Sequence, residues 1–368
     1  MGKINVGIIG MKFGKEFVNI YQSHPLVGKV AICQRDPGAL ARNGEELGIP
    51  EQLRFGDFKG IADCDELDAI HVVSPVPEHV EHTLYALGAG KHVACTVPMA
   101  LSIEDIGRIC EAKEKSGKYY MMMETAVYTR EYLYVKGLVE KGAFGRIQFV
   151  RGSHMQDMGL EGWAEYWLGL PPFFYGTHAI APLLMINKAA AEYVVGHGSG
   201  RLSDDLARRY GSPFAVETVT IKLKGSDVVA EATRSLYETV RQYRESFDLY
   251  GTKMAFEWDQ IADEGQVLFE GGESARRFTA PDTDGLLIDE LKRFTKRDEV
   301  LDKDNPSFIQ GAGHGGSHPH LVHEFVSAIA EGREPALNAG VAANITAAGI
   351  CGHESCMKGG EKIYIPVF

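Results

Sequence analysis

The chain has 368 residues, of which 45% are hydrophobic and 24% are charged, as in folded globular proteins. That length exceeds one ordinary compact core, so we expect two domains or one large α/β unit and exclude a single small binding module. With 38 Lys+Arg against 50 Asp+Glu, the formal net charge is −12. Such a charge repels nucleic acid and anionic membranes, so the expected partner is a small molecule.

The N-terminal sequence MGKINVGIIG has no basic segment, signal-length apolar core or cleavage site. No apolar run in the chain reaches the length of a transmembrane helix. The six cysteines are scattered and form no CxxC pair, which argues against disulfides and a zinc site. We therefore expect a cytoplasmic protein with reduced thiols.

The first third of the chain alternates apolar runs with helical segments. Ser102 is placed to cap one of these helices and Gly117 to end it. Strands are predicted at residues 4–10, 29–34, 68–75, 91–98 and 119–124. This alternation predicts an α/β domain over residues 1–124, a doubly wound parallel sheet of the Rossmann type.

After Glu124 the pattern changes to consecutive runs with β alternation. Strands are expected at 146–154, 217–225, 228–237, 246–251, 254–259 and 266–272, with a helix around 132–142. Strands without intervening helices predict a second, α+β domain over residues 125–368, with an open and mainly antiparallel sheet. A Gly- and His-rich stretch at 311–320 precedes two helical segments and a last strand at 362–368.

The first strand runs into a turn with glycines at positions 7, 10 and 14, but Lys12 stands where GxGxxG has its second glycine. Backbone N–H groups and the helix dipole at such a turn favour a pyrophosphate, although a purely structural turn uses the same glycines. We predict that this turn binds a dinucleotide through Gly10, Met11, Lys12, Phe13 and Gly14.

The second strand ends at Gln34, where an acidic residue normally binds the adenosine ribose hydroxyls. Gln34 can still hydrogen-bond them without repelling a 2′-phosphate, and Arg35 can attract one. The choice between NAD and NADP therefore stays open. Ser74, Pro75 and His79 follow the third long strand and are expected to line the crevice at the strand ends; the alternative is a strand terminator and a surface histidine.

Three segments carry a resemblance to a known family: residues 6–10, 73–93 and 97–109. Together they resemble the glucose-fructose oxidoreductase and inositol dehydrogenase family (Gfo/Idh/MocA), and the resemblance continues to the C-terminal helices. It implies a Rossmann domain joined to an open-faced sheet domain, with NAD(P) holding its nicotinamide over that sheet. It also implies a homodimer or homotetramer, because the open sheet is usually buried between subunits.

One departure from the family pattern bears on the chemistry. Dehydrogenases of the family carry Glu-Lys-Pro after the fifth strand, and the lysine helps to deprotonate the hydroxyl being oxidised. Here the triplet, which the resemblance places beside the cofactor, is Thr96, Val97 and Pro98. The family's Asp-x-x-x-His pair is also broken, because Phe174 stands four residues before His178.

These losses resemble the NAD-dependent glycosidase branch, typified by α-N-acetylgalactosaminidases, which has valine before the proline. That branch carries Tyr-x-Thr-His, as residues 175–178 do here, and has a tyrosine at the position of His154. The segments at 121–128, 241–253 and 313–318 are similar too. The resemblance implies a catalytic set of His178, Tyr175, Tyr243, Glu124 and His154.

Such a glycosidase oxidises the sugar at C3, which acidifies the C2 hydrogen. A base removes that hydrogen, the C1 substituent departs, water adds, and the stored hydride returns. The route needs a tightly held NAD and several proton-transfer groups, and no paired carboxylates. Tyr175 and His178, three apart, lie on one side of a helical turn; the alternative is a packing tyrosine and a buried structural histidine.

Candidate substrate contacts include arginines that suit an anionic sugar such as a uronate or sulfonate, unless they form structural ion pairs. The predicted set is Arg130, Arg151, Trp163, Arg234 and His314. Four histidines at 314–323 raise the question of a metal, but they lack an established ligand pattern. We expect no metal and a glycine-rich loop near the substrate. A sugar or polyol dehydrogenase and a non-catalytic sugar or cofactor sensor remain as alternatives.

Overall fold

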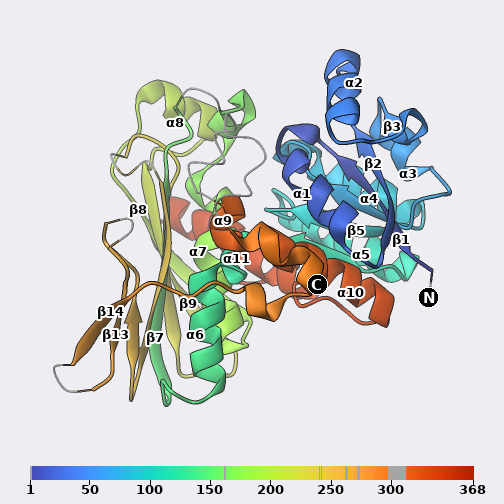
Figure 1. Ribbon diagram of the computed structural model, residues 1–368. Coiled ribbons are helices and arrows are strands. Elements are labelled where there is room, and N and C mark those ends of the chain that lie inside the picture. Colours follow the sequence, from blue (N-terminus) through green and yellow to red (C-terminus); the bar gives the residue numbers. More distant parts are fainter. Residues whose placement is uncertain are drawn as a thin grey trace. The chain divides into compact units, whose positions relative to one another are not determined.

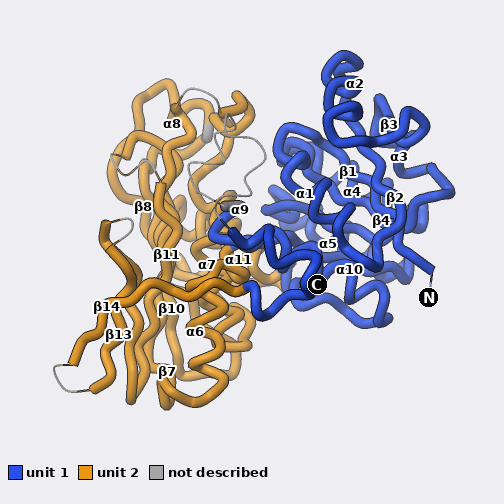
Figure 2. Tube along the Cα trace, viewed as in Figure 1, with its two compact units in different colours: residues 1–125, 284–343, 368 blue, residues 126–283, 344–367 orange. Residues whose placement is uncertain are grey.

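The computed structural model describes residues 2–160, 163–239, 241, 243–261, 264–271, 274–296 and 312–368. Two compact units make up the chain (Figure 2): unit 1 contains residues 1–125, 284–343 and 368, and unit 2 contains residues 126–283 and 344–367. Within the described ranges, no helix is both long and apolar enough to cross a membrane.

Unit 1 is built on a six-stranded, all-parallel sheet with the order β3-β2-β1-β4-β5-β6. Central strands such as β4 are buried on both faces, as parallel strands covered by helices require. The expected doubly wound sheet is confirmed. Its strands are β1 (Ile4–Ile9), β2 (Val27–Cys33), β3 (Arg54–Phe55), β4 (Ala69–Val72), β5 (His92–Thr96) and β6 (Tyr120–Met123).

In unit 1, one helix begins and ends at the capping residues predicted from the sequence. Ser102 Oγ accepts a hydrogen bond from the Asp105 amide at 3.1 Å, and Gly117 ends that helix in a left-handed conformation. The helices are α1 (Met11–Ser23), α2 (Pro37–Glu46), α3 (Phe58–Ala62), α4 (His79–Gly88), α5 (Ile103–Ser116), α9 (Ala312–Gly316) and α10 (His318–Glu331), while α11 (Ala339–Met357) runs from unit 1 into unit 2.

Residues 284–343 group with unit 1, which differs from the expected single domain over 125–368. The reason is that α10 packs against α1: His318 Nδ1 lies 3.1 Å from Glu16 Oε2, and its ring centroid lies 4.6 Å from that of Phe17. Further along, the Leu337 carbonyl accepts a hydrogen bond from the amide of Met122 in β6. The expected glycine-rich loop at 311–320 is wrong where it is described, because residues 312–316 and 318–320 are helical.

Unit 2 is built on a nine-stranded mixed sheet (Figure 1) with the order β14-β13-β12-β11-β7-β10-β9-β8-β15. Only the β7–β10 pair is parallel among the described pairs, so the predicted, mainly antiparallel sheet is confirmed. The strands are β7 (Ile147–Gln156), β8 (Ala191–Ser199), β9 (Val216–Leu223), β10 (Val229–Ser235), β11 (Tyr243–Gly251), β12 (Ala255–Glu257), β13 (Gln266–Phe269), β14 (Ala275–Phe278) and β15 (Ile363–Tyr364).

Helix α7 (Thr177–Asn187) covers the middle of one face of this sheet, where it packs against β7, β10 and β11. The approach is close: a Cβ on Gly152 of β7 would lie 2.2 Å from the Ala179 carbonyl oxygen. Because side chains alternate along a strand, even-numbered residues of β7 face α7. Helices α6 (Arg130–Glu140) and α8 (Asp204–Tyr210) also belong to unit 2.

Candidate functional site

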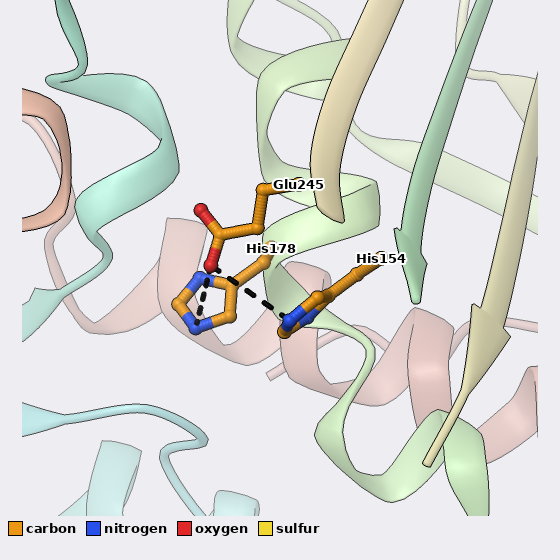
Figure 3. A group of neighbouring side chains, drawn as sticks. All are labelled: His154, His178 and Glu245. Carbon is orange, nitrogen blue, oxygen red and sulfur yellow. Dashed lines mark ion pairs between the residues drawn. The ribbon is translucent and has the colours of Figure 1, made fainter. Parts of the chain in front are cut away.

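Three ionisable side chains converge within unit 2 between the sheet and the start of α7 (Figure 3). Glu245 Oε1, on β11, lies 3.8 Å from His154 Nε2 on β7 and 3.9 Å from His178 Nε2 on α7. The two histidines are 1% and 4% exposed, whereas the Glu245 side chain keeps 13% of its surface accessible. The carboxylate thus lies at the open side of a buried pair of imidazoles.

Two tyrosines extend this cluster. The Tyr175 hydroxyl lies 3.1 Å from His178 Nε2, and the Tyr243 hydroxyl donates to Glu245 Oε1. Burial, reinforced by the neighbouring Glu245 carboxylate, raises the pKa of Tyr243 well above its usual value. Tyr243 therefore stays protonated at neutral pH. We refer to His154, Tyr175, His178, Tyr243 and Glu245 as the unit 2 cluster.

Strand register and helix geometry explain why residues far apart in sequence meet here. Neighbouring antiparallel strands β7 and β11 place His154 directly opposite Glu245, and cross-strand pairs have adjacent side chains. His178 is the second residue of α7, and Tyr175 ends the 3-10 turn (Pro172–Tyr175) just before it. Their contact agrees with the predicted i, i+3 relationship.

Arg234 supports the cluster from β10, where it pairs with His154 in parallel register. Its fully buried guanidinium donates to the carbonyl oxygens of Tyr175 at 2.7 Å and His154 at 2.9 Å, to Gln156 Oε1 at 3.1 Å, and to the Ser235 carbonyl. Burial lowers the pKa of Arg234 to about 10, which leaves it charged at neutral pH. Arg234, a predicted substrate contact, holds the backbone of two cluster residues.

Arg151 lies away from the unit 2 cluster. As an odd-numbered residue of β7, it projects from the sheet face opposite to that of His154. There its Nε donates to Asp248 Oδ2 at 2.6 Å. Of the two roles considered for Arg151, substrate contact or structural ion pair, the structure shows the ion pair.

Aromatic side chains link Trp163 to the cluster. Its ring centroid lies 6.4 Å from that of Trp167, which in turn lies 4.6 Å from the Tyr175 ring. Trp163 is thus placed two rings away from the Tyr175–His178 pair. Arg130, another predicted substrate contact, is the first residue of α6.

Two of the predicted catalytic and substrate-binding residues belong to unit 1 and are not part of the unit 2 cluster. Glu124 follows β6 and is fully buried. His314 lies on α9, where its Nδ1 is 3.1 Å from His318 Nε2 and its ring contacts Phe13 at 5.7 Å between centroids. His314 therefore neighbours the predicted cofactor turn in its own unit.

The turn between β1 and α1 fits a dinucleotide. Gly10 has φ +97°, and a Cβ there would lie 2.5 Å from the Val73 carbonyl oxygen. A Cβ on Gly14 would lie 2.9 Å from Ile8 Cγ2. Among the described residues, no side-chain hydrogen bond caps the N-terminus of α1, and the N-terminus of a helix favours a pyrophosphate. Met11 is buried in the same turn, while Lys12 is exposed.

The residues after β2 are engaged locally. Gln34 Oε1 accepts from Asn43 Nδ2 at 2.6 Å, and Arg35 forms a surface ion pair with Glu78 at 3.2 Å. Surface ion pairs contribute little to stability, so Arg35 can exchange this partner for a ligand. Neither residue introduces a negative charge against a 2′-phosphate.

His79 is a structural connector rather than the surface histidine of the alternative interpretation. It is 1% exposed, with Nδ1 2.8 Å from the Pro98 carbonyl oxygen and Nε2 2.9 Å from the Ser74 carbonyl oxygen. Burial opposes its charge, but Cys95 and the two carbonyls outweigh that effect and raise the pKa of His79. Ser74 Oγ pairs with His82. These contacts fix the carboxyl ends of β4 and β5.

The loop that carries lysine in family dehydrogenases offers no titratable group here. Thr96 ends β5, where its hydroxyl donates to the Val72 carbonyl at 3.3 Å. Val97 is 7% exposed, and Pro98 follows it. Pro75 begins the turn after β4. The ionisable groups suited to proton transfer are therefore those of the unit 2 cluster rather than this loop.

Sequence reasoning missed Glu245. A signal was available, because Tyr243 and Glu245 are two residues apart in a β-rich run and so share one strand face. Nothing in the sequence indicated that this face meets His154 across β7.

Comparison with known proteins adds a family match. Residues 4–124 match the model of the GFO_IDH_MocA oxidoreductase family, described as an NAD-binding Rossmann fold. A glycosyl hydrolase family 109 protein of Porphyromonas gingivalis is 27% identical over 172 residues, covering 45% of this chain and 36% of that protein. Other curated relatives carry the same family name. The chain spans less than two thirds of the length of the curated relatives it matches.

Solved structures share the fold over the full chain. An NAD binding oxidoreductase from Klebsiella pneumoniae superposes with a TM-score of 0.80 at 15% identity, covering 100% of both chains. A scyllo-inositol dehydrogenase from Lactobacillus casei, solved with NAD(H) and scyllo-inositol, gives 0.73 at 20% identity, covering 99% of both. At these identities the likeness concerns the fold alone.

Proposed function

Residues 4–124 form an NAD-binding domain of the GFO/IDH/MocA oxidoreductase family, and from this premise we propose that the protein is an NAD-dependent glycoside hydrolase. Its route is redox-neutral: oxidation at C3 of the sugar, elimination across C1 and C2, addition of water, and re-reduction. The curated relatives named glycosyl hydrolase family 109 support this choice.

The observation that carries the proposal is the unit 2 cluster, together with the absence of a lysine at Val97. A simple alcohol oxidation needs one base. Elimination and hydration need more: a proton leaves the C3 hydroxyl, another leaves C2, and one reaches the departing group. Three kinds of group in the cluster, imidazole, phenol and carboxylate, match this requirement.

The residues divide the proton transfers as follows. The Tyr175–His178 pair takes the C3 hydroxyl proton, because their hydrogen bond passes it from phenol to imidazole. His154, next to the Glu245 carboxylate, is the base at C2, since the carboxylate stabilises the imidazolium that forms. Tyr243, held protonated by its raised pKa, donates to the departing C1 substituent. Water then adds at C1 and a proton returns to C2.

The cofactor is assigned to the β1–α1 turn, with the α1 amides on the pyrophosphate and Gln34 near the adenosine ribose. When bound, NAD would supply a hydride acceptor for C3 and would return that hydride to the same carbon, so that no net oxidation would result. The reduced cofactor would have to stay bound within each turnover, because the hydride must be stored until water has added.

A sugar or polyol dehydrogenase is the second candidate. The observation in its favour is the Tyr175–His178 pair, which by itself suffices to deprotonate a hydroxyl without the family lysine. A dehydrogenase leaves Tyr243 and the His154–Glu245 pair without a role, which is why we place it second.

A panel of aryl glycosides with neutral, N-acetylated and uronate sugars, assayed with and without added NAD, tests the proposal. We expect aglycone release with no accumulation of NADH. Accumulation of NADH with an intact glycosidic bond would instead establish the dehydrogenase. Binding of sugar and NAD with neither reaction would indicate a sensor.

A further inference from the structure

The unit 2 cluster contains three neighbouring side chains of the types that bind metal ions. We propose that His154, His178 and Glu245 bind one divalent first-row transition ion of the Zn²⁺ and Mn²⁺ class. The coordinating atoms, one from each residue, all lie within 4.8 Å of one another. Figure 3 shows the carboxylate directed at both imidazoles from its own strand. This site replaces the expectation of no metal drawn from the sequence.

The two distances between the carboxylate and the imidazoles are close to those of a bound ion, and the distance between the two imidazole nitrogens is at most 4.8 Å. Zinc bonds of about 2.1 Å in a tetrahedral site put ligand atoms about 3.4 Å apart. Glu245 Oε1 is 3.8 and 3.9 Å from the two imidazole Nε2 atoms, so the carboxylate edges need to contract by about half an ångström. Rotation about the side-chain bonds of Glu245 moves the carboxylate by such a distance without moving the strands.

The donor set selects the class of ion. Two imidazoles and one carboxylate are the protein ligands of catalytic zinc sites that keep an open position, and nitrogen–oxygen sets of this kind also suit Mn²⁺. The imidazoles are buried and the carboxylate is 13% exposed. An ion would thus enter at the carboxylate and keep its remaining positions for water or substrate.

The surroundings hold the ligands in place. Arg234 donates to the backbone carbonyl of His154, and β11 fixes Glu245 opposite the same residue. Such outer contacts orient metal ligands and raise affinity. An ion at His178 Nε2 would displace the Tyr175 hydroxyl from that nitrogen and leave the phenol beside the ion. The Arg234 charge is spread over four protein oxygens, which limits its repulsion of the ion.

The ion would take over part of the proposed function, on which this part of the inference rests, because His154 and His178 cannot act as bases through Nε2 atoms that bind a metal. A divalent ion that binds the C3 oxygen lowers the pKa of the hydroxyl and, after oxidation, polarises the ketone and acidifies C2. Family dehydrogenases use lysine to deprotonate the hydroxyl, and here Val97 cannot. The metal thus provides the electrophile that the chain lacks.

The test uses the full-length protein, freed of metal with a chelator and titrated by calorimetry with Zn²⁺ and Mn²⁺, and with Co²⁺ followed by its visible absorption. Glu245→Gln and His154→Gln each remove a ligand. His197→Gln is the matched control, because His197 is an exposed histidine of β8 in the same unit. Circular dichroism checks that each variant is folded.

We expect one ion per chain and an affinity lowered at least about 100-fold in both ligand variants, with the control unchanged. Absence of binding by the wild-type protein, or equal binding by all variants, would overturn the site. Ion binding without aglycone release would refute the hydrolase and keep the metal site. Full aglycone release by protein that binds no ion would keep the hydrolase and refute the metal site.

Discussion

Replacing Tyr175 with phenylalanine separates the chemical role of the Tyr175–His178 pair from its structural role. The change deletes one oxygen and leaves the ring, so the contact with Trp167 and the position under the Arg234 guanidinium, 5.3 Å from the ring centroid, persist. What is lost is the 3.1 Å hydrogen bond to His178 Nε2. Such a bond contributes about 0.5–1.5 kcal/mol to stability, or roughly 1–6 °C in melting temperature for a unit of this size.

The expected effect on rate is much larger. Loss of a positioned acid–base group costs about 10²- to 10⁴-fold, which is about 2.7–5.4 kcal/mol in activation free energy. The assay measures kcat for aglycone release, NAD affinity by calorimetry, and the melting temperature. Tyr193→Phe is the control: Tyr193 is on β8 and packs against Tyr364, outside the cluster. If Tyr175→Phe kept kcat within about threefold of wild type, the pair would have no catalytic role.

Three further outcomes are expected. Gly10→Ala should weaken NAD binding, measured by calorimetry, at least about tenfold. Gly10 has a φ of +97°, and a Cβ at this position would lie 2.5 Å from the Val73 carbonyl oxygen, so the turn would have to move. An unchanged affinity for NAD would show that the cofactor binds elsewhere. Arg234→Met should lower the free energy of unfolding, measured in urea, by about 3 kcal/mol or more. The acceptor oxygens of His154, Tyr175 and Gln156 lose their buried donor. A decrease of less than about 1 kcal/mol would contradict this structural role of Arg234. The free energy of unfolding should also fall as the pH drops from about 6.5 toward 4. Burial lowers the pKa of His24 and His92 to about 4, so in this range the unfolded chain binds protons that the folded chain does not. A free energy of unfolding that stays constant over this pH range would refute the prediction.

The parallel sheet of unit 1 was accessible from the sequence because its signals are local. Buried strands are short apolar runs, and helix ends are marked by residues such as Ser102 and Gly117. The place of residues 284–343 was not accessible, since it depends on contacts such as that of His318 with Glu16, about three hundred residues apart. The helical form of residues 312–316 and 318–320 was hidden by glycines, which disfavour helices in isolation and were overridden by tertiary packing.

For the candidate site, the sequence indicated several of the residues but not most of the contacts between them. Tyr175 and His178 were predictable as neighbours because one helical turn joins them. Arg234 looked like a ligand contact, and only the sheet register shows that it faces backbone carbonyls. Glu245 was missed, because a single charged residue in a strand is typical of a solvent-exposed face, and its approach to His154 depends on pairing across 91 positions.

The central claim, elimination across C1 and C2 after oxidation at C3, is tested most directly by cleaving an aryl glycoside in deuterium oxide. Deprotonation at C2 and reprotonation from solvent exchange that hydrogen, while the hydride at C3 returns to the carbon it left. The account predicts a released sugar that carries deuterium at C2 and its original hydrogen at C3, detected by NMR and mass spectrometry. A released sugar that retains its original hydrogen at C2 would contradict the account.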